Sequence, residues 1–462
     1  MKESLFQEFE EVSAQQWKQK IQYDLKGEDY NEKLIFKSLD GVDVKPFYST
    51  EDVQQTISTP SPKNWNICER IYVASVKISN KKALHALEKG AESLWFIIPS
   101  EETDLNLLLK NISEKTPVYI STPFFSLDFF GKIKSMLKEK DYKIFLQHDI
   151  IGNLARTGNW FSNLTEDHQV LDEIFSKSEG FKSVISVDIT LYQNAGATIP
   201  QQLAYAVAHA NEYLNHFNQN DFFGKKKNLD IQFINASGSH YFFEIAKIKA
   251  LRWLFSTLAK EYSIPENCHI LAMPSKRNKT LYDYNVNLLR TTTESMSAVL
   301  GGADTVYNLP YDAVFHKNNE FGDRIARNQL LVMKNEAYLD KVSNASEGSY
   351  YIENLTRQFA EMALDIFKDI EKGGGFLKQL KEGIIQKKIQ ESAGAEQEKF
   401  NHGEVVLIGT NKFPNPEDKM QNELQLFPFL KKNPRKTLIQ PILERRLSEE
   451  LEQERLEKEK AE

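Results

Sequence analysis

Eight short apolar runs recur along this chain, and segments with helical spacing separate them. The runs are rich in Val, Ile, Phe and Tyr and are bounded by Gly, Pro, Ser or Asp, as expected for strands buried in a parallel sheet. They are Ile71–Val76, Leu94–Ile98, Pro117–Ile120, Lys143–Leu146, Ser183–Ile189, Ile231–Ile234, His269–Met273 and Thr305–Tyr307. This alternation predicts a closed (β/α)8 barrel of the TIM type. An open, doubly wound sheet is the alternative.

The segments between the runs carry apolar residues at the spacing of an amphipathic helix. Leu203, Val207, Ala210 and Leu214 fall on one helical face. Gly301 follows the helical stretch Thr293–Leu300 and is typical of a helix end.

The length of 462 residues exceeds the roughly 250 residues of one barrel, so flanking segments are expected. We predict an N-terminal arm at 1–66, the barrel at 67–320, a helical extension completing the barrel domain at 321–440, and a charged helical tail at 441–462. The tail carries a thin leucine stripe among charged residues. Such a stripe indicates either a solvated end, which we favour, or contact with a partner helix.

Composition excludes several classes of protein. The net charge of −7 argues against a general nucleic-acid binder, and we expect the basic triplet Lys225–Lys227 to lie in a solvated loop. Cys68 and Cys268 form no metal-ligand pattern and no disulfide framework, which favours a reducing cytoplasm. The charged first thirty residues argue against a secretory signal, and the apolar run Leu94–Pro99 is too short to span a membrane.

Polar residues at the ends of the predicted strands are the candidates for chemistry, because active sites of barrels lie at that face. They are His148, Asp149, Asp188, Thr190, Asn235, Ser237, Ser275 and Asn308. His148 and Asp149 could form an acid–base pair, but neighbouring strand residues point to opposite faces, so we do not expect them to cooperate.

Three further polar residues have structural interpretations. His240 begins a predicted helix and is expected to order the preceding turn. Arg324 and Arg327 lie three residues apart on a helix, where salt bridges are more common than a phosphate clamp. The chain contains no glycine-rich phosphate loop, no HExxH motif and no GxSxG motif.

Several stretches resemble the methylmalonyl-CoA mutases, which interconvert methylmalonyl-CoA and succinyl-CoA by adenosylcobalamin radical chemistry. The stretches, in the order of that family, are AGAT at 195–198, FFEIAK at 242–247, RTTTE at 290–294, RIARN at 324–328, GSYYIE at 348–353 and VLIGTNKF at 406–413. The resemblance covers residues from about 20 to 440. It implies a (β/α)8 barrel and an isomerase that acts on acyl-CoA in propionate metabolism.

The departures from the family pattern fall at positions that the resemblance links to chemistry. Leu191 stands where catalytic members carry a histidine beside the thioester carbonyl. Leu309 and Ala313 replace an asparagine and a glutamate that contact the adenosyl group. A leucine cannot donate a hydrogen bond or polarise a carbonyl. The stretch 229–233 lacks an arginine of the family, and 271–275 also differs from the family pattern.

Two further family features have no counterpart in this chain. One is the N-terminal segment with a catalytic tyrosine, and the other is the DxHxxG motif of a cobalamin-binding domain. We therefore expect no catalytic, cofactor-binding or metal-binding residue in this chain, and no cobalamin-binding domain.

This combination, together with NLARTGNW at 153–160, resembles the small, non-catalytic subunits of heterodimeric bacterial mutases. It implies a cytoplasmic partner of a large subunit that holds adenosylcobalamin and acyl-CoA. The arm and the helices after residue 320 are the expected contact surfaces, and neither nucleic acid nor membrane is an expected partner.

Two other functions remain open. The chain could be the barrel subunit of a split acyl-CoA isomerase that is itself catalytic with a separate cobalamin-binding chain. It could also retain acyl-CoA binding without chemistry, although Phe96, Phe145 and Tyr119 suggest a bulky interior that blocks a threaded pantetheine.

Overall fold

The computed structural model describes the chain except for residues 1–7, 11, 54–56, 221, 223–229, 432–434 and 462. The basic triplet Lys225–Lys227 therefore lies outside the described residues, as does Leu229 of the stretch 229–233.

Eight parallel strands form one sheet in the order β6-β5-β4-β3-β10-β9-β8-β7. The strands are β3 (Asn66–Tyr72), β4 (Ser93–Ile97), β5 (Pro117–Ser121), β6 (Lys143–Leu146), β7 (Ile185–Asp188), β8 (Ile231–Ser237), β9 (His269–Pro274) and β10 (Thr305–Tyr307). A bridge from Phe145 to Ser183 joins β6 to β7. The Leu146 amide donates to the Ser183 carbonyl at 2.9 Å and the Lys182 amide to the Ile144 carbonyl at 2.8 Å. The sheet thus closes into the predicted (β/α)8 barrel, and the open-sheet alternative is wrong.

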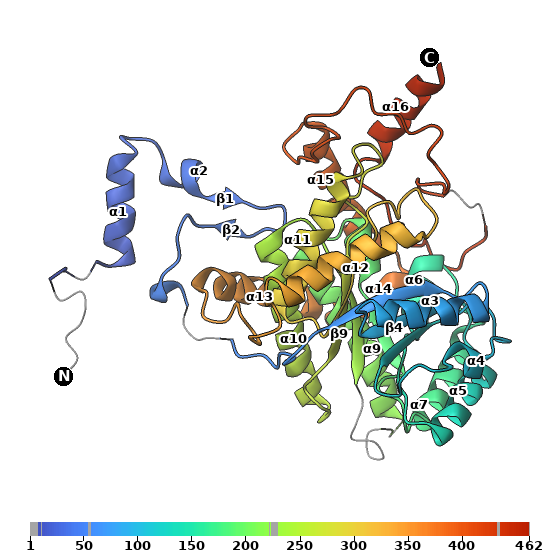
Figure 1. The fold of residues 1–462 in the computed structure, drawn as a ribbon. Coiled ribbons are helices and arrows are strands. Elements are labelled where there is room, and N and C mark those ends of the chain that lie inside the picture. Colours follow the sequence, from blue (N-terminus) through green and yellow to red (C-terminus); the bar gives the residue numbers. More distant parts are fainter. Residues whose placement is uncertain are drawn as a thin grey trace.

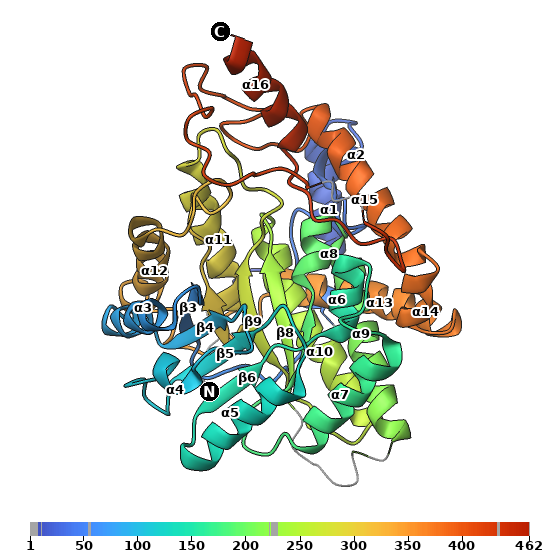
Figure 2. The same cartoon turned by 90° about the vertical axis from the view of Figure 1, so that its right-hand side faces the viewer.

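Helices surround this barrel, as Figure 2 shows for the side that carries β4 to β6. They are α3 (Val76–Glu88), α4 (Leu105–Leu108), α5 (Leu127–Glu139), α6 (Ile150–Thr157), α7 (Leu164–Ser176), α8 (Thr190–Ala195), α9 (Ile199–Gln219), α10 (Tyr241–Glu261), α11 (Val286–Gly301) and α12 (Glu320–Asn335). Local sequence signals set several of their ends. Asp149 caps the start of α6, and Gly302 adopts a left-handed conformation after α11.

The last described elements are α13 (Tyr350–Lys372), α14 (Phe376–Lys381), α15 (Ile384–Asn401) and α16 (Glu449–Ala461). Helix α13 packs against α9 and α10 on the outside of the barrel. The predicted solvated tail is wrong, because α16 packs on the molecule. Leu456 and Glu452 are buried, and Glu452 accepts a hydrogen bond from the Leu281 amide at 2.9 Å. The few leucines of the tail predicted too little packing, because its buried carboxylates also contact the molecule.

The N-terminal segment extends away from the barrel, as Figure 1 shows at its left. It contains α1 (Ala14–Asp24), α2 (Tyr30–Leu34), the antiparallel pair β1 (Phe36–Lys37) and β2 (Asp43–Val44), and the short 3-10 helix Thr50–Asp52. No residue of α1 is buried, so this helix shares no core with the barrel.

The interior of the barrel is filled by side chains from alternate strand positions. Tyr119 and Phe145 stack with ring centroids 4.8 Å apart, and the Tyr119 hydroxyl lies 2.8 Å from Nε2 of His269. Trp95 also belongs to this interior cluster. Phe96 instead packs between the sheet and the helices, because successive strand residues face opposite sides. The bulky interior is thus present, but Trp95 rather than Phe96 supplies the β4 ring.

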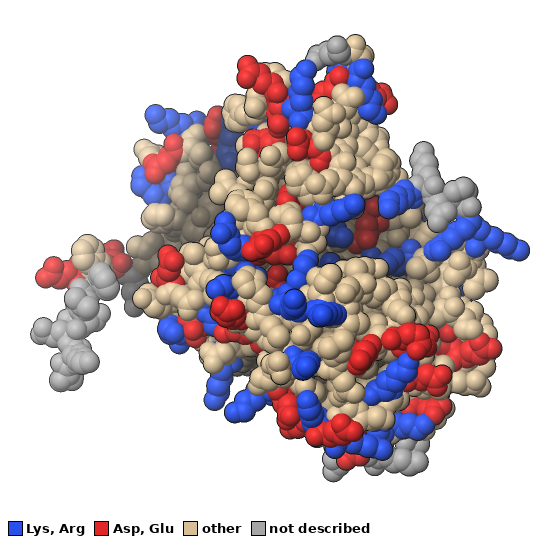
Figure 3. Space-filling model, turned by 45° about the vertical axis from the view of Figure 1, so that its right-hand side comes forward, with Lys and Arg blue, Asp and Glu red and all other residues tan. Residues whose placement is uncertain are grey.

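The described part of the chain contains no helix with the length and apolar character needed to cross a membrane. Figure 3 shows acidic and basic side chains interspersed on one face, without a large area of either charge.

Candidate functional site

A cavity of about 610 Å³ lies at the mouth of the barrel, where the C-terminal ends of the strands meet. Its lining comes from at least six strands or the loops that follow them, which is the usual location of a barrel active site. His148, Asp149, Asp188 and Thr190 of the predicted residues contribute to the lining. The sequence therefore predicted four of the residues that line this cavity.

His148 and Asp149 are neighbours in the chain but do not act on each other. The buried His148 ring meets Phe125 edge to face at 5.0 Å, and burial lowers the pKa of His148 to about 4, so the ring is neutral at pH 7. Asp149 accepts hydrogen bonds from the Gly152 amide at 2.7 Å and the Tyr213 hydroxyl at 2.7 Å. Its Oδ1 also lies 2.9 Å from Nε2 of His209.

Asp188 holds the cavity wall together through a two-carboxylate clamp on Arg156. Arg156 Nη2 lies 2.6 Å from Asp188, and its Nη1 lies 2.8 Å from Glu444. The two carboxylates raise the pKa of Arg156 despite the opposing effect of burial, so its charge is fixed. Thr190 donates its hydroxyl proton to Asp188 at 2.5 Å, and this completes the carboxylate's contacts.

The other predicted residues at strand ends lie outside the cavity. Asn235 and Ser237 are fully buried in β8, and Ser275 donates to Asn194 at 3.0 Å. Asn308 donates to the Ala326 carbonyl at 3.0 Å and so ties β10 to α12. These four residues are parts of the scaffold.

Residues 435–448, here called the strap, cross the mouth of the barrel from the end of α6 toward α16. The Leu438 amide donates to the Gly158 carbonyl at 2.9 Å, and the Arg445 amide donates to the Asn194 carbonyl at 3.1 Å. Figure 2 shows this red C-terminal chain passing over the upper end of the barrel. The strap delivers Glu444 to Arg156 and covers part of the site.

Sequence reasoning missed several residues that line this cavity: Arg70, Trp95, Gln147, Arg156, Lys276 and Glu444. Strand alternation could have found Arg70, because it shares a face of β3 with Cys68, and Lys276 follows the end of β9. No local signal could have found Glu444, because the strap that carries it is remote in sequence.

The three positions that the resemblance assigned to chemistry lie away from this cavity. Leu191 on α8 is 1% exposed and belongs to the main hydrophobic core. Leu309 and Ala313 line a second cavity of about 490 Å³ beside the first, between the strap and the loop after β10. Apolar side chains at all three positions offer no hydrogen bond to a ligand.

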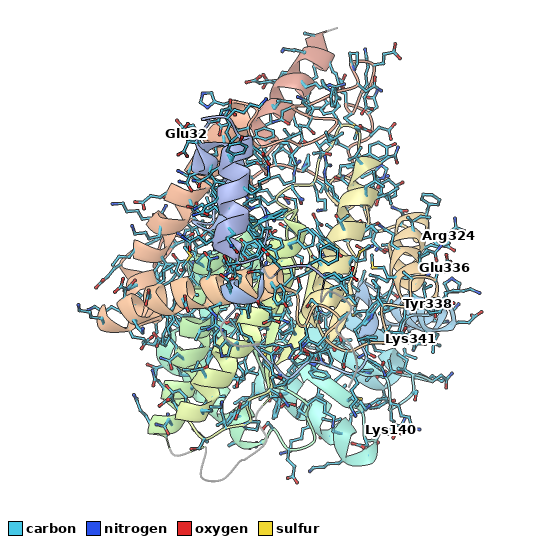
Figure 4. The ribbon with its side chains drawn as sticks, turned by 90° about the vertical axis from the view of Figure 1, so that its left-hand side faces the viewer. Glu32, Lys140, Arg324, Glu336, Tyr338 and Lys341 are labelled. Atoms are coloured by element: carbon cyan, nitrogen blue, oxygen red, sulfur yellow. The ribbon has the colours of Figure 1, made fainter. Side chains whose placement is uncertain are left out.

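Of the arginine pair, only Arg327 forms the salt bridge expected from sequence, and His240 contacts the helix that it precedes. Arg327 is buried and pairs with Glu69 at 2.8 Å, whereas Arg324 lies over the Phe321 ring at 5.4 Å. Figure 4 shows Arg324 at the outer edge of the molecule, so the two guanidinium groups do not form a phosphate clamp. The His240 ring stacks on Phe243 at 3.6 Å at the start of α10. No group of three or more metal-ligating side chains occurs in the described residues.

Comparison with known proteins gives a consistent result. The family model for methylmalonyl-CoA mutase matches residues 115–459. A methylmalonyl-CoA mutase small subunit from Porphyromonas gingivalis is 32% identical over 90% of this chain and 72% of its own length. One from Streptomyces virginiae is 26% identical over 89% of this chain and 72% of its own length. A methylmalonyl-CoA mutase from Rhizobium meliloti is 33% identical over 52% of this chain but only 34% of its own length.

Proposed function

Because this chain belongs to the methylmalonyl-CoA mutase family, we propose that it is a small subunit that supports a catalytic large subunit in the interconversion of methylmalonyl-CoA and succinyl-CoA. The observation that carries this proposal is the match to small subunits over 90% of the chain. Large subunits are also among its relatives, and one from Streptomyces virginiae is 27% identical over 61% of this chain.

The burial of Leu191 supports a non-catalytic role. This side chain stands at the position that the resemblance aligns with a histidine, yet it packs inside the hydrophobic core. General acid–base or electrostatic assistance requires a polar group in contact with the substrate. The filled interior adds support, because Tyr119, Phe145 and Trp95 occupy the axis along which a pantetheine chain would have to pass.

The family uses cobalamin, and the residues of this mouth do not fit a corrin. Leu309 and Ala313 present apolar groups at the positions that the resemblance links to the adenosyl group, and the strap covers part of the mouth. We therefore assign adenosylcobalamin to the large subunit, and we derive no chemical step through it in this chain.

The N-terminal arm is the proposed contact surface for the large subunit, together with the helices after residue 320. Trp17 is 49% exposed and Tyr23 is 80% exposed on α1, which contributes no residue to the core. Exposed aromatic residues on a projecting segment are typical of a protein interface. A cytoplasmic location is consistent with the two unpaired, buried cysteines.

Co-expression with the large subunit of the same organism tests this function. We expect the two chains to elute together from a size-exclusion column, with cobalamin absorbance and mutase activity only in fractions that contain the large subunit. Turnover of methylmalonyl-CoA by this chain with adenosylcobalamin, alone or with a separate cobalamin-binding chain, would instead support a split isomerase. A large subunit that is fully active and stable without this chain would also contradict the proposal.

A further inference from the structure

Two cationic side chains of the described residues line the mouth cavity without a direct ion pair. Within the part of the chain that the structure describes, neither the Arg70 guanidinium nor the Lys276 ammonium group forms a salt bridge or a hydrogen bond. Both side chains line the same cavity. Cations in a confined site are normally paired, because charge is costly to remove from water.

Burial lowers the pKa of Lys276, and Glu444 and Asp188 oppose this at longer range, but the hydrogen bonds of the nearby carboxylates go to other groups. Asp188 and Glu444 are bound to Arg156 at 2.6 and 2.8 Å. Asp149 is held by Gly152, Tyr213 and His209. The lining holds three cations (Arg70, Arg156 and Lys276) and three carboxylates (Asp149, Asp188 and Glu444), so Arg70 and Lys276 contribute unused N–H donors and not an excess of positive charge.

Aromatic packing orients the Arg70 group toward a ligand. Its guanidinium lies 4.7 Å from the Trp95 ring centroid and 6.0 Å from that of Tyr307. A guanidinium stacked on a ring keeps its N–H edge free for bidentate hydrogen bonds to an oxyanion.

A buried, unpartnered amide also lines the cavity. Gln147 is 8% exposed and its Oε1 accepts a hydrogen bond from Ser121, while its Nε2 has no partner. A buried N–H donor without an acceptor is unfavourable, and a ligand oxygen in the cavity would satisfy it.

We propose that this cavity binds a small divalent oxyanion, either inorganic phosphate or a short dicarboxylate, between Arg70 and Lys276. The volume of about 610 Å³ is ample for such an ion with its hydration water. Ile97, Ile234 and Met273 form an apolar part of the wall that suits the methylene groups of a dicarboxylate. The site belongs to this chain alone and does not depend on the large subunit.

Isothermal titration calorimetry of the full chain tests the site, with sodium phosphate and sodium succinate as separate probes in a buffer without other oxyanions. We expect one of the two to bind with a stoichiometry of one, and its identity distinguishes the two chemistries. Lys276→Met and Arg70→Met should each weaken binding about ten- to hundredfold, the usual effect of losing a charged hydrogen bond. Arg324→Met removes an arginine that stacks on a ring outside the cavity and should bind like the wild type.

Arg70→Lys provides a second variant in case Arg70→Met does not fold. It keeps the positive charge but cannot donate two parallel hydrogen bonds to one oxyanion. Its affinity should also fall. Absence of binding by both probes overturns the proposal, as does binding that neither cavity variant weakens. Because the titration uses this chain without a partner, its failure leaves the proposed small-subunit role intact, and loss of partner binding leaves the anion site intact.

Discussion

Leu191 belongs to the hydrophobic core, and this burial determines what substitution there does. The side chain is 1% exposed, so its removal leaves a cavity among packed neighbours. We predict that Leu191→Ala lowers the free energy of unfolding by about 2–5 kcal/mol, whereas Leu191→Met costs less than about 1.5 kcal/mol. Urea denaturation followed by circular dichroism measures both. Equal, small effects would show that the side chain faces the mouth and not the core.

Glu69 gives a prediction of pH dependence. It lies beneath α12, where Arg327 binds it at 2.8 Å, and burial raises its pKa from 4.5 to about 7 although Arg327 opposes this. Between pH 4.5 and 7 the folded chain keeps the proton while the unfolded chain releases it. Stability contributed by this group is therefore complete below pH 4.5 and is lost as the pH rises to 7, by roughly 3 kcal/mol.

Glu69→Gln removes the titrating group and should flatten this fall in unfolding free energy between pH 4.5 and 7. Glu320→Gln is the matched control, because Glu320 is an exposed glutamate beside the same ion pair. Denaturant titrations at several pH values measure the slope for each variant. A Glu69→Gln slope equal to that of the wild type would contradict the raised pKa.

The apolar runs alone did not determine which residues of each strand point into the barrel. Tyr119 and Phe145 were placed in the interior correctly, but Phe96 was not, since Trp95 carries the inward register of β4. Arg156 lies in the quoted stretch 153–160, yet its role depends on Glu444, which is 288 residues away. Periodicity carries no information about contacts of this range, so the charged clamp at the mouth could not be predicted.

At the scale of elements, all eight strands were predicted, but the bounds of the first strand were wrong. Lys143–Leu146 and Thr305–Tyr307 match the structure, whereas the first run was placed too late at Ile71–Val76. Strand β3 begins at Asn66 because that residue pairs with Thr305, and Val76 already starts α3 after the cap position Ser75. Because apolar residues continue beyond Tyr72, the sequence pattern did not show where β3 ends and α3 begins.

Gly158 ends helix α6 and lies against the strap, and its backbone needs the conformational freedom of glycine. Its φ is +78°, and an added Cβ would lie 2.7 Å from the Ile439 carbonyl oxygen. Gly383 has a similar φ of +77° with no atom within 4 Å of such a Cβ. Substitution of either glycine would therefore strain the backbone, but only a side chain at Gly158 would also collide with the strap.

Gly383→Ala should cost about 1–2 kcal/mol of unfolding free energy from the left-handed conformation alone. Gly158→Ala should cost more than this, because the strap must also move away from α6. Limited proteolysis between residues 435 and 441 should be faster in Gly158→Ala than in Gly383→Ala. Equal proteolysis rates in the two variants would mean that the strap does not depend on this close approach.

At the scale of the whole molecule, a closed barrel carries two attached segments with different relations to its core. The strap lies across the mouth and is fixed by backbone hydrogen bonds and by the Arg156–Glu444 pair. The arm extends away, and its helix α1 contributes nothing to the core (Figure 1). Changes in the strap should therefore affect the stability of this chain, whereas changes in α1 should affect association.

The final prediction concerns this separation between stability and association. Replacing Trp17 and Tyr23 together by alanine removes two exposed rings from α1, of which Trp17 contacts only Phe47 among aromatic rings in the described residues, at 5.8 Å. The melting temperature should change little, because no core contact is lost. Affinity for the large subunit should fall at least about tenfold, since Trp and Tyr dominate binding energy at interfaces.

Surface plasmon resonance with immobilised large subunit measures this affinity, and differential scanning calorimetry measures the melting temperature. Leu164→Ala is the control, because Leu164 is 40% exposed at the start of α7, on the other side of the barrel from the arm (Figure 1). That variant should bind like the wild type. If the double variant also binds like the wild type, these two rings are not part of the interface, and the rest of the arm or the helices after residue 320 carry the association. If its melting temperature instead falls by as much as expected for a core substitution, α1 stabilises the barrel and the separation of roles is wrong.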